Sequence, residues 1–163
     1  MSIVVKKGIL VDESVWLALC LDLNERGEEA YQFLTAATGK VNLYVTATCL
    51  QDVWNDLCHV LRHVVTVEGG VVDDRIEALI ASIAWDSVAF VRDAATVITA
   101  GPVEAERAEM LKDLQADYRE ALLVATAEAC RASCIVTFED SLRDCLPVKC
   151  LKPLDAVRAF GLC

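Results

Sequence analysis

The stretch GILVDESVWLALCL, residues 8–21, decides the fold. It continues an apolar run that starts at residues 3–5, and it reaches its first acid at Asp12. An uninterrupted apolar run of this kind is typical of a strand buried on both faces of a parallel sheet. After Asp12, apolar side chains recur at helical spacing at Val15, Trp16 and Leu19. The stretch therefore predicts a central strand, an acidic turn and a helix.

The same alternation of strands and helices continues to the end of the chain. Apolar runs predict further strands at 41–45, 133–137 and 148–151. Helices are expected at 25–38, from Thr46 or Thr48 to about residue 66, within 72–99 as two helices or one kinked helix, and at 103–114, 118–131 and 153–160. Alternating strands and helices indicate a sheet covered on both faces. The predicted fold class is α/β, a three-layer sandwich with a central, mainly parallel sheet of four or five strands.

The length and net charge of the chain indicate the number of domains and limit the ligands that it can bind. The chain has 163 residues, which corresponds to one domain. Fifteen Lys and Arg against 25 Asp and Glu give a net charge of −10, which excludes broad, sequence-blind binding of duplex nucleic acid. The 55% of apolar residues exceeds the roughly 45–50% of ordinary globular chains, so we expect a partner to cover part of the surface.

Targeting and cysteine patterns point to the cytoplasm. The start MSIVVKK is too short and too charged for a signal peptide, and no apolar run is long enough to span a membrane. The eight cysteines contain no CxxC pair, so we interpret them as small buried apolar residues. Structural zinc or disulfides are the less favoured alternative.

Acidic residues follow three of the predicted strands. In a parallel sheet, chemistry takes place beyond the carboxyl ends of the strands. The acids at or near that edge are Asp12, Asp52, Asp117, Glu120, Glu139 and Asp140. Two carboxylates ~4 Å apart repel by about 4 kcal/mol at an effective dielectric constant near 20, so a cluster favours a bound divalent cation. Oxygen ligands without a nearby His or Cys indicate Mg²⁺ or Mn²⁺.

Each acid also has a simpler interpretation. Asp12 at a strand end is what a helix cap requires, and Asp52 suits the dipole of an early helical turn. Glu139 and Asp140 are equally compatible with a polar loop. The argument for a metal site therefore depends on their joint placement at one edge.

The chain resembles a PIN domain, the metal-dependent nuclease fold of ribonuclease toxins. The resemblance rests on residues 8–21, on VTATCLQDVWNDL at 45–57 and on ADYREALLVATAEACRASCIVTFEDSLRDCLPVKCL at 116–151. It implies a single PIN-like domain over residues 1–163. The chain departs from the family pattern in the length of its acidic side chains. Asp52 stands where the family usually has Glu, and Glu120 and Glu139 stand where it usually has Asp.

The resemblance also implies roles for individual residues. The catalytic set would be Asp12, Asp52, Glu120 and Glu139, with Asp117 and Asp140 as additional metal ligands. Ser14, where the family often has Asn, and Thr137 would hydrogen-bond the ligand carboxylates or the attacking water. A helix cap or strand-end hydrogen bond is the alternative for both hydroxyls.

The implied function is a Mg²⁺- or Mn²⁺-dependent endoribonuclease that hydrolyses phosphodiester bonds of single-stranded RNA. As in toxin-type relatives, the resemblance implies a homodimer that an antitoxin protein binds. The alternative is a catalytically lapsed PIN-like interaction or regulatory module. A phosphoacceptor receiver domain is disfavoured, because Val45-Thr46 supplies no acceptor Asp at the end of the second strand.

Basic and aromatic residues give weaker indications. Candidates for gripping RNA are Lys40, His59, Arg62, His63, Arg119 and Arg143, although the favoured interpretation of each is a solvated surface charge. Trp16, Trp54 and Trp85 lie in helical apolar patterns, which favours core or dimer contacts over base stacking.

Overall fold

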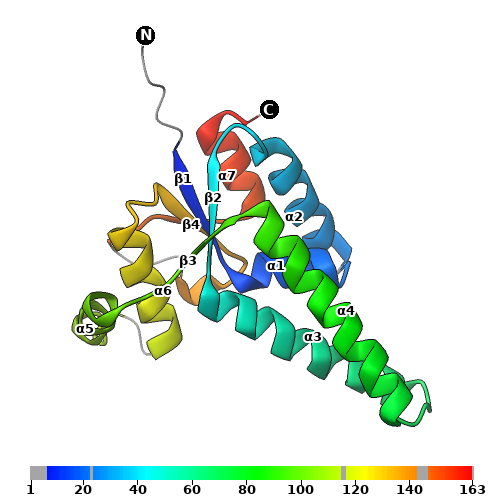
Figure 1. Cartoon of the computed structure of the whole chain (residues 1–163). Helices are drawn as coiled ribbons and strands as arrows, with labels where there is room; N and C mark the ends of the chain where they lie inside the picture. The colour runs from blue at the N-terminus through cyan, green and yellow to red at the C-terminus, as the bar shows by residue number, and fades with distance from the viewer. Residues whose placement is uncertain (1–6, 23, 115–116, 143–146, 163) are drawn as a thin grey trace.

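Within the described residues, five parallel strands form the central sheet in the order β3-β2-β1-β4-β5 (Figure 1). The computed structural model describes residues 7–22, 24–114, 117–142 and 147–162. The strands are β1 (Gly8–Val11), β2 (Asn42–Thr46), β3 (Thr96–Ile98), β4 (Cys134–Val136) and β5 (Cys150–Leu151). The predicted α/β class with a parallel sheet is confirmed, and the predicted strand at residues 3–5 lies outside the described residues.

Helices cover both faces of this sheet. They are α1 (Glu13–Cys20), α2 (Asn24–Ala37), α3 (Ala47–Val67), α4 (Asp74–Ala94), α5 (Pro102–Met110), α6 (Tyr118–Ala129) and α7 (Pro153–Phe160), with a short 3₁₀ turn, η1 (Asp140–Leu142). Helices α1, α2 and α7 pack on one side and α5 and α6 on the other, while α3 and α4 extend together as a long antiparallel pair (Figure 1). The three layers match the predicted sandwich.

The segment 72–99 was predicted to be entirely helical, and this is wrong at its end. A single helix, α4, covers residues 74–94, and Thr96–Ile98 forms β3 at the edge of the sheet. The backbone of Ala95 is already extended, and Val97 is 37% exposed. A three-residue, half-exposed edge strand lacks the apolar run that identifies buried strands, so the preceding helical pattern masked it. Helix α5 likewise ends at Met110 rather than at residue 114.

The core is built around the central strands. Ile9, Leu10 and Val11 of β1 are fully buried, as are Ile135 and Val136 of β4. Burial on both faces agrees with the continuous apolar sequence of these strands.

The three tryptophans divide between the core and the α3–α4 pair. Trp16 is fully buried in the core, whereas Trp54 and Trp85 pack against each other with ring centroids 6.1 Å apart and Trp85 63% exposed. The position of Trp16 agrees with the predicted core role, whereas the exposed Trp85 is not a core residue and the suggested dimer contact stays a prediction.

Of the described cysteines, Cys49, Cys58, Cys134 and Cys150 are buried, as the sequence predicts, whereas Cys20 and Cys130 are half-buried. Cys145 and Cys163 lie outside the described residues. No helix in the described ranges is long and apolar enough to cross a membrane.

Two leucines on neighbouring helices test the assignment of the core. Leu57 on α3 is 1% exposed and Leu79 on α4 is 55% exposed. We expect Leu57→Ala to lower the free energy of unfolding by about 2–5 kcal/mol, because it removes buried methyl groups and leaves a cavity. Leu79→Ala is the matched control and should change it by about 0.5 kcal/mol or less. Urea denaturation measures both, and equal losses would contradict the packing described here.

Candidate active site

Four of the predicted acids line one pocket at the carboxyl ends of the strands. They are Asp12, Asp52, Glu120 and Glu139. Asp12 follows β1, Asp52 lies in α3 after β2, Glu120 lies in the first turn of α6 and Glu139 follows β4. Segments far apart in the sequence thus meet at one edge because parallel strands end on the same side.

Asp117 and Asp140 are not among the lining residues of this pocket. Asp117 is the N-cap of α6, and its Oδ1 accepts a hydrogen bond from the Glu120 amide at 3.1 Å. Asp140 begins the 3₁₀ turn η1. Their suggested role as additional metal ligands stays a prediction, and the cap is a sufficient structural role for Asp117.

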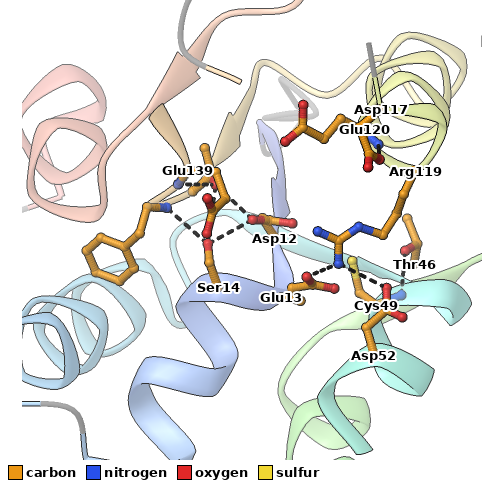
Figure 2. Close-up of polar contacts among 12 residues, drawn as sticks. Asp12, Glu13, Ser14, Thr46, Cys49, Asp52, Asp117, Arg119, Glu120 and Glu139 are labelled. Atoms are coloured by element: carbon orange, nitrogen blue, oxygen red, sulfur yellow. Dashed lines mark hydrogen bonds and ion pairs between the residues drawn. The ribbon is translucent and has the colours of Figure 1, made fainter. Parts of the chain in front are cut away.

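Asp12 is held by two hydroxyl groups. Ser14 Oγ and Thr137 Oγ1 each donate a hydrogen bond to Asp12 Oδ2 at 2.8 Å, and Asp12 is 5% exposed (Figure 2). The amides of Phe138 and Glu139 in turn donate to Ser14 Oγ at 3.0 Å and Thr137 Oγ1 at 2.9 Å. The start of α1 and the end of β4 are thereby linked around one carboxylate whose orientation is fixed.

Glu13 also lines the pocket, although the sequence did not single it out as a site residue. It is 7% exposed, and the pKa of its carboxyl is raised from about 4.5 to about 8. Burial is the largest cause; hydrogen bonding with Asp52 and the charge of Asp12 act in the same direction, while Arg119 opposes the shift. The signal was present in the sequence, since Glu13 is the one charged residue in the apolar segment ESVWLALC of α1.

Arg119 lies among these carboxylates. Its Nη1 donates hydrogen bonds to Glu13 Oε1 and, at 3.4 Å, to Asp52 Oδ2 (Figure 2). Burial lowers the pKa of the guanidinium, but the charge and hydrogen bond of Glu13 and the charges of Asp52 and Asp12 together outweigh it, so the pKa is raised. The interpretation of Arg119 as a solvated surface charge is therefore incomplete, because the side chain is 46% exposed but also forms two ion pairs with acids of the pocket.

The other suggested RNA-gripping residues that the structure describes do not line this pocket. Arg62 forms a two-pronged ion pair with Glu77 between α3 and α4, at 2.7 and 2.9 Å. Lys40 donates to the carbonyl of Leu162 at 2.5 Å. His59 and His63 are exposed on α3, and Arg143 lies outside the described residues.

The donor set of the pocket fits Mg²⁺ or Mn²⁺ by its chemistry, because its five acids are carboxylates and hard cations prefer oxygen ligands. The positions of the side chains are less favourable. Over the described ranges, no group of three or more His, Cys, Asp or Glu side chains is placed so that it could hold a metal ion. Arg119 occupies Glu13 and Asp52, and Ser141 Oγ donates to Glu120 Oε1 at 2.6 Å.

Comparison with known proteins supports the fold. No family model matches the sequence, and no curated protein matches it. Three solved structures align over most of the chain, each with a TM-score of 0.60. One is a toxin–antitoxin complex from Klebsiella pneumoniae, at 16% identity over 89% of this chain and 97% of that chain. Another is VapC20 of Mycobacterium tuberculosis, described as a sarcin-ricin loop cleaving toxin. It is 16% identical, over 82% of this chain and 92% of that chain.

The third is PAE2754 of Pyrobaculum aerophilum, at 15% identity over 95% of this chain and 90% of that chain. At these identities the likeness shows the fold alone. The predicted PIN-like fold is confirmed: a parallel sheet in the order 3-2-1-4-5 flanked by helices.

The raised pKa of Glu13 predicts how stability depends on pH. Between about pH 4.5 and 8 the native protein holds a proton on Glu13 that the unfolded chain has lost. The stability that this proton contributes is fully present below about pH 4.5 and is lost as the pH rises through about 8. We expect the melting temperature of the wild type, relative to Glu13→Gln, to fall between pH 5 and pH 8. Thermal denaturation without metal measures it, and a constant difference would show that the pKa is not raised.

Proposed function

We propose that this protein is a metal-dependent endoribonuclease that hydrolyses phosphodiester bonds of single-stranded RNA. The observation that carries the proposal is the gathering of Asp12, Asp52, Glu120 and Glu139 in one pocket of a PIN-like fold. The net charge of −10 agrees with a substrate engaged at a local, cation-assisted site rather than along a basic surface.

In this proposal the four carboxylates hold Mg²⁺ or Mn²⁺, with Asp117 and Asp140 nearby. When bound, the ion lowers the pKa of a coordinated water and neutralises charge on the scissile phosphate. Asp12 is the best-oriented ligand, because Ser14 and Thr137 both hydrogen-bond to its Oδ2. Among the described residues, none donates a hydrogen bond to the other oxygen, Oδ1, which is thus available to a cation.

We further propose the cellular setting that the similar structures suggest. One of them is a toxin–antitoxin complex and another is described as a sarcin-ricin loop cleaving toxin. By analogy, this chain acts in the cytoplasm as a homodimer and is controlled by an antitoxin protein. Exposed apolar residues on α4, including Ile83, Trp85 and Phe90, offer surface that such partners cover.

A second candidate is a PIN-like interaction or regulatory module whose site no longer acts on RNA. The observation in its favour is that Arg119 already forms ion pairs with Glu13 and Asp52. The two functions differ in whether carboxylate charge in the pocket is needed for RNA cleavage.

Cleavage of a mixed single-stranded RNA pool with Mn²⁺ tests the proposed function. We expect Asp12→Asn and Asp52→Asn to reduce the cleavage rate by about 100-fold or more, because each removes a carboxylate that would hold the metal ion. Asp56→Asn is the matched control, since Asp56 is exposed on the same helix as Asp52. It should cleave at the wild-type rate.

A wild-type protein that is as inert as Asp12→Asn at high enzyme concentration would overturn the nuclease proposal. The interaction module would then be favoured.

A further inference from the structure

Arg119 occupies a position that is electrostatically unfavourable for a cation. It follows Tyr118 in the first turn of α6, immediately after the N-cap Asp117. The N-terminus of a helix carries partial positive charge, which favours acidic rather than basic side chains. A compensating interaction is therefore needed, and it comes from the pocket rather than from the helix.

The compensation links three helices. Nη1 of Arg119 contacts Glu13 at the start of α1 and Asp52 in α3. The Glu13 side chain is 9% exposed and that of Asp52 is 25% exposed, so both carboxylates have lost much of their hydration. Ion pairs shielded from water in this way are stronger than those on a fully exposed surface.

The pocket contains more acidic than basic side chains, and this imbalance gives Arg119 a particular importance. Five carboxylates line the pocket, and among its described lining residues Arg119 is the one cation: Asp12, Glu13, Asp52, Glu120 and Glu139 are the acids. The guanidinium thus stands where a positive charge is most needed. It also engages two of the carboxylates that a divalent cation would approach.

We propose that the Arg119 guanidinium is the resident cation of this pocket, and that Arg119 and a divalent metal ion compete for the carboxylates of Glu13 and Asp52. The inference deepens the proposed function, because it describes how the same site is held closed until metal binds. It explains why the carboxylates line one pocket without three of them converging on an ion position.

Release of Arg119 is feasible because its side chain is 46% exposed and its two ion pairs with described residues are both made by Nη1, at the end of the side chain. The long stem can turn the guanidinium into solvent, where an RNA phosphate offers a bidentate partner. Glu13, in contrast, is buried and cannot follow. The site exchanges one cation for another.

Calorimetric titration of the metal-free, full-length chain with Mn²⁺ tests the competition. We expect Arg119→Gln to bind Mn²⁺ about tenfold or more tightly than the wild type, because the competing charge is gone. Arg119→Lys keeps the charge but loses the planar fork of donors, so its affinity should lie between the two. The matched control is Arg62→Gln, which removes the remote ion pair with Glu77 and should bind as the wild type does.

Thermal denaturation gives a second readout that does not depend on activity. Without metal, Arg119→Gln should melt below the wild type, since Asp52 loses its counter-charge and Glu13 loses a hydrogen-bond donor. Saturating Mn²⁺ should raise its melting temperature more than that of the wild type, because ligand binding to the native state stabilises it. Equal or weaker Mn²⁺ binding by Arg119→Gln, or equal metal-induced shifts, would overturn the inference.

These outcomes are separable from a failure of the proposed function. If Arg119→Gln gains affinity for Mn²⁺ and neither protein cleaves RNA, the competition stands and the nuclease proposal falls. If the wild type cleaves RNA and Arg119→Gln gains no affinity, the nuclease proposal stands and the competition falls.

Discussion

Several carboxylates lie together at one end of the sheet, and they repel one another. The arrangement of the pocket depends on how the folded chain reduces this repulsion. Because β1, β2 and β4 end on the same side, the acids that follow them are forced together. Two carboxylates about 4 Å apart repel by about 4 kcal/mol at an effective dielectric constant near 20. The folded chain reduces this cost in two ways: Arg119 supplies a positive charge, and the pKa of Glu13 is raised towards its neutral form.

Asp12 and Arg119 are held in the pocket in different ways, and only Asp12 is fixed. Asp12 is positioned by hydroxyls that are themselves bonded to backbone amides, so its place follows from the junction of β1 and β4. Arg119 is positioned by the end of a long, half-exposed side chain. The pocket therefore combines a fixed acceptor with an exchangeable counter-charge, which is what a site that binds and releases charged ligands requires.

Strand-end acids were readable from the sequence because a buried parallel strand is a continuous apolar run and its end is marked by the first charge. That logic located Asp12 and Glu139, and the helix that follows β2 located Asp52. The edge strand β3 was missed because three half-exposed residues leave no such run. The ion pairs of Arg119 were missed for another reason: sequence spacing fixes where a Cα lies, but not which of several neighbours a long side chain contacts.

The order of strands in the sheet also bears on how the chain is synthesised. The hydrogen bond between Asp12 and Thr137 joins residues 125 positions apart, and β1 pairs with β4 on one side and β2 on the other. At about 5–20 residues per second on the ribosome, about 6–25 s pass between the synthesis of β1 and that of β4. During this time the edge of β1 that pairs with β4 is unpaired, and an unpaired edge of this kind can pair with another chain and start aggregation.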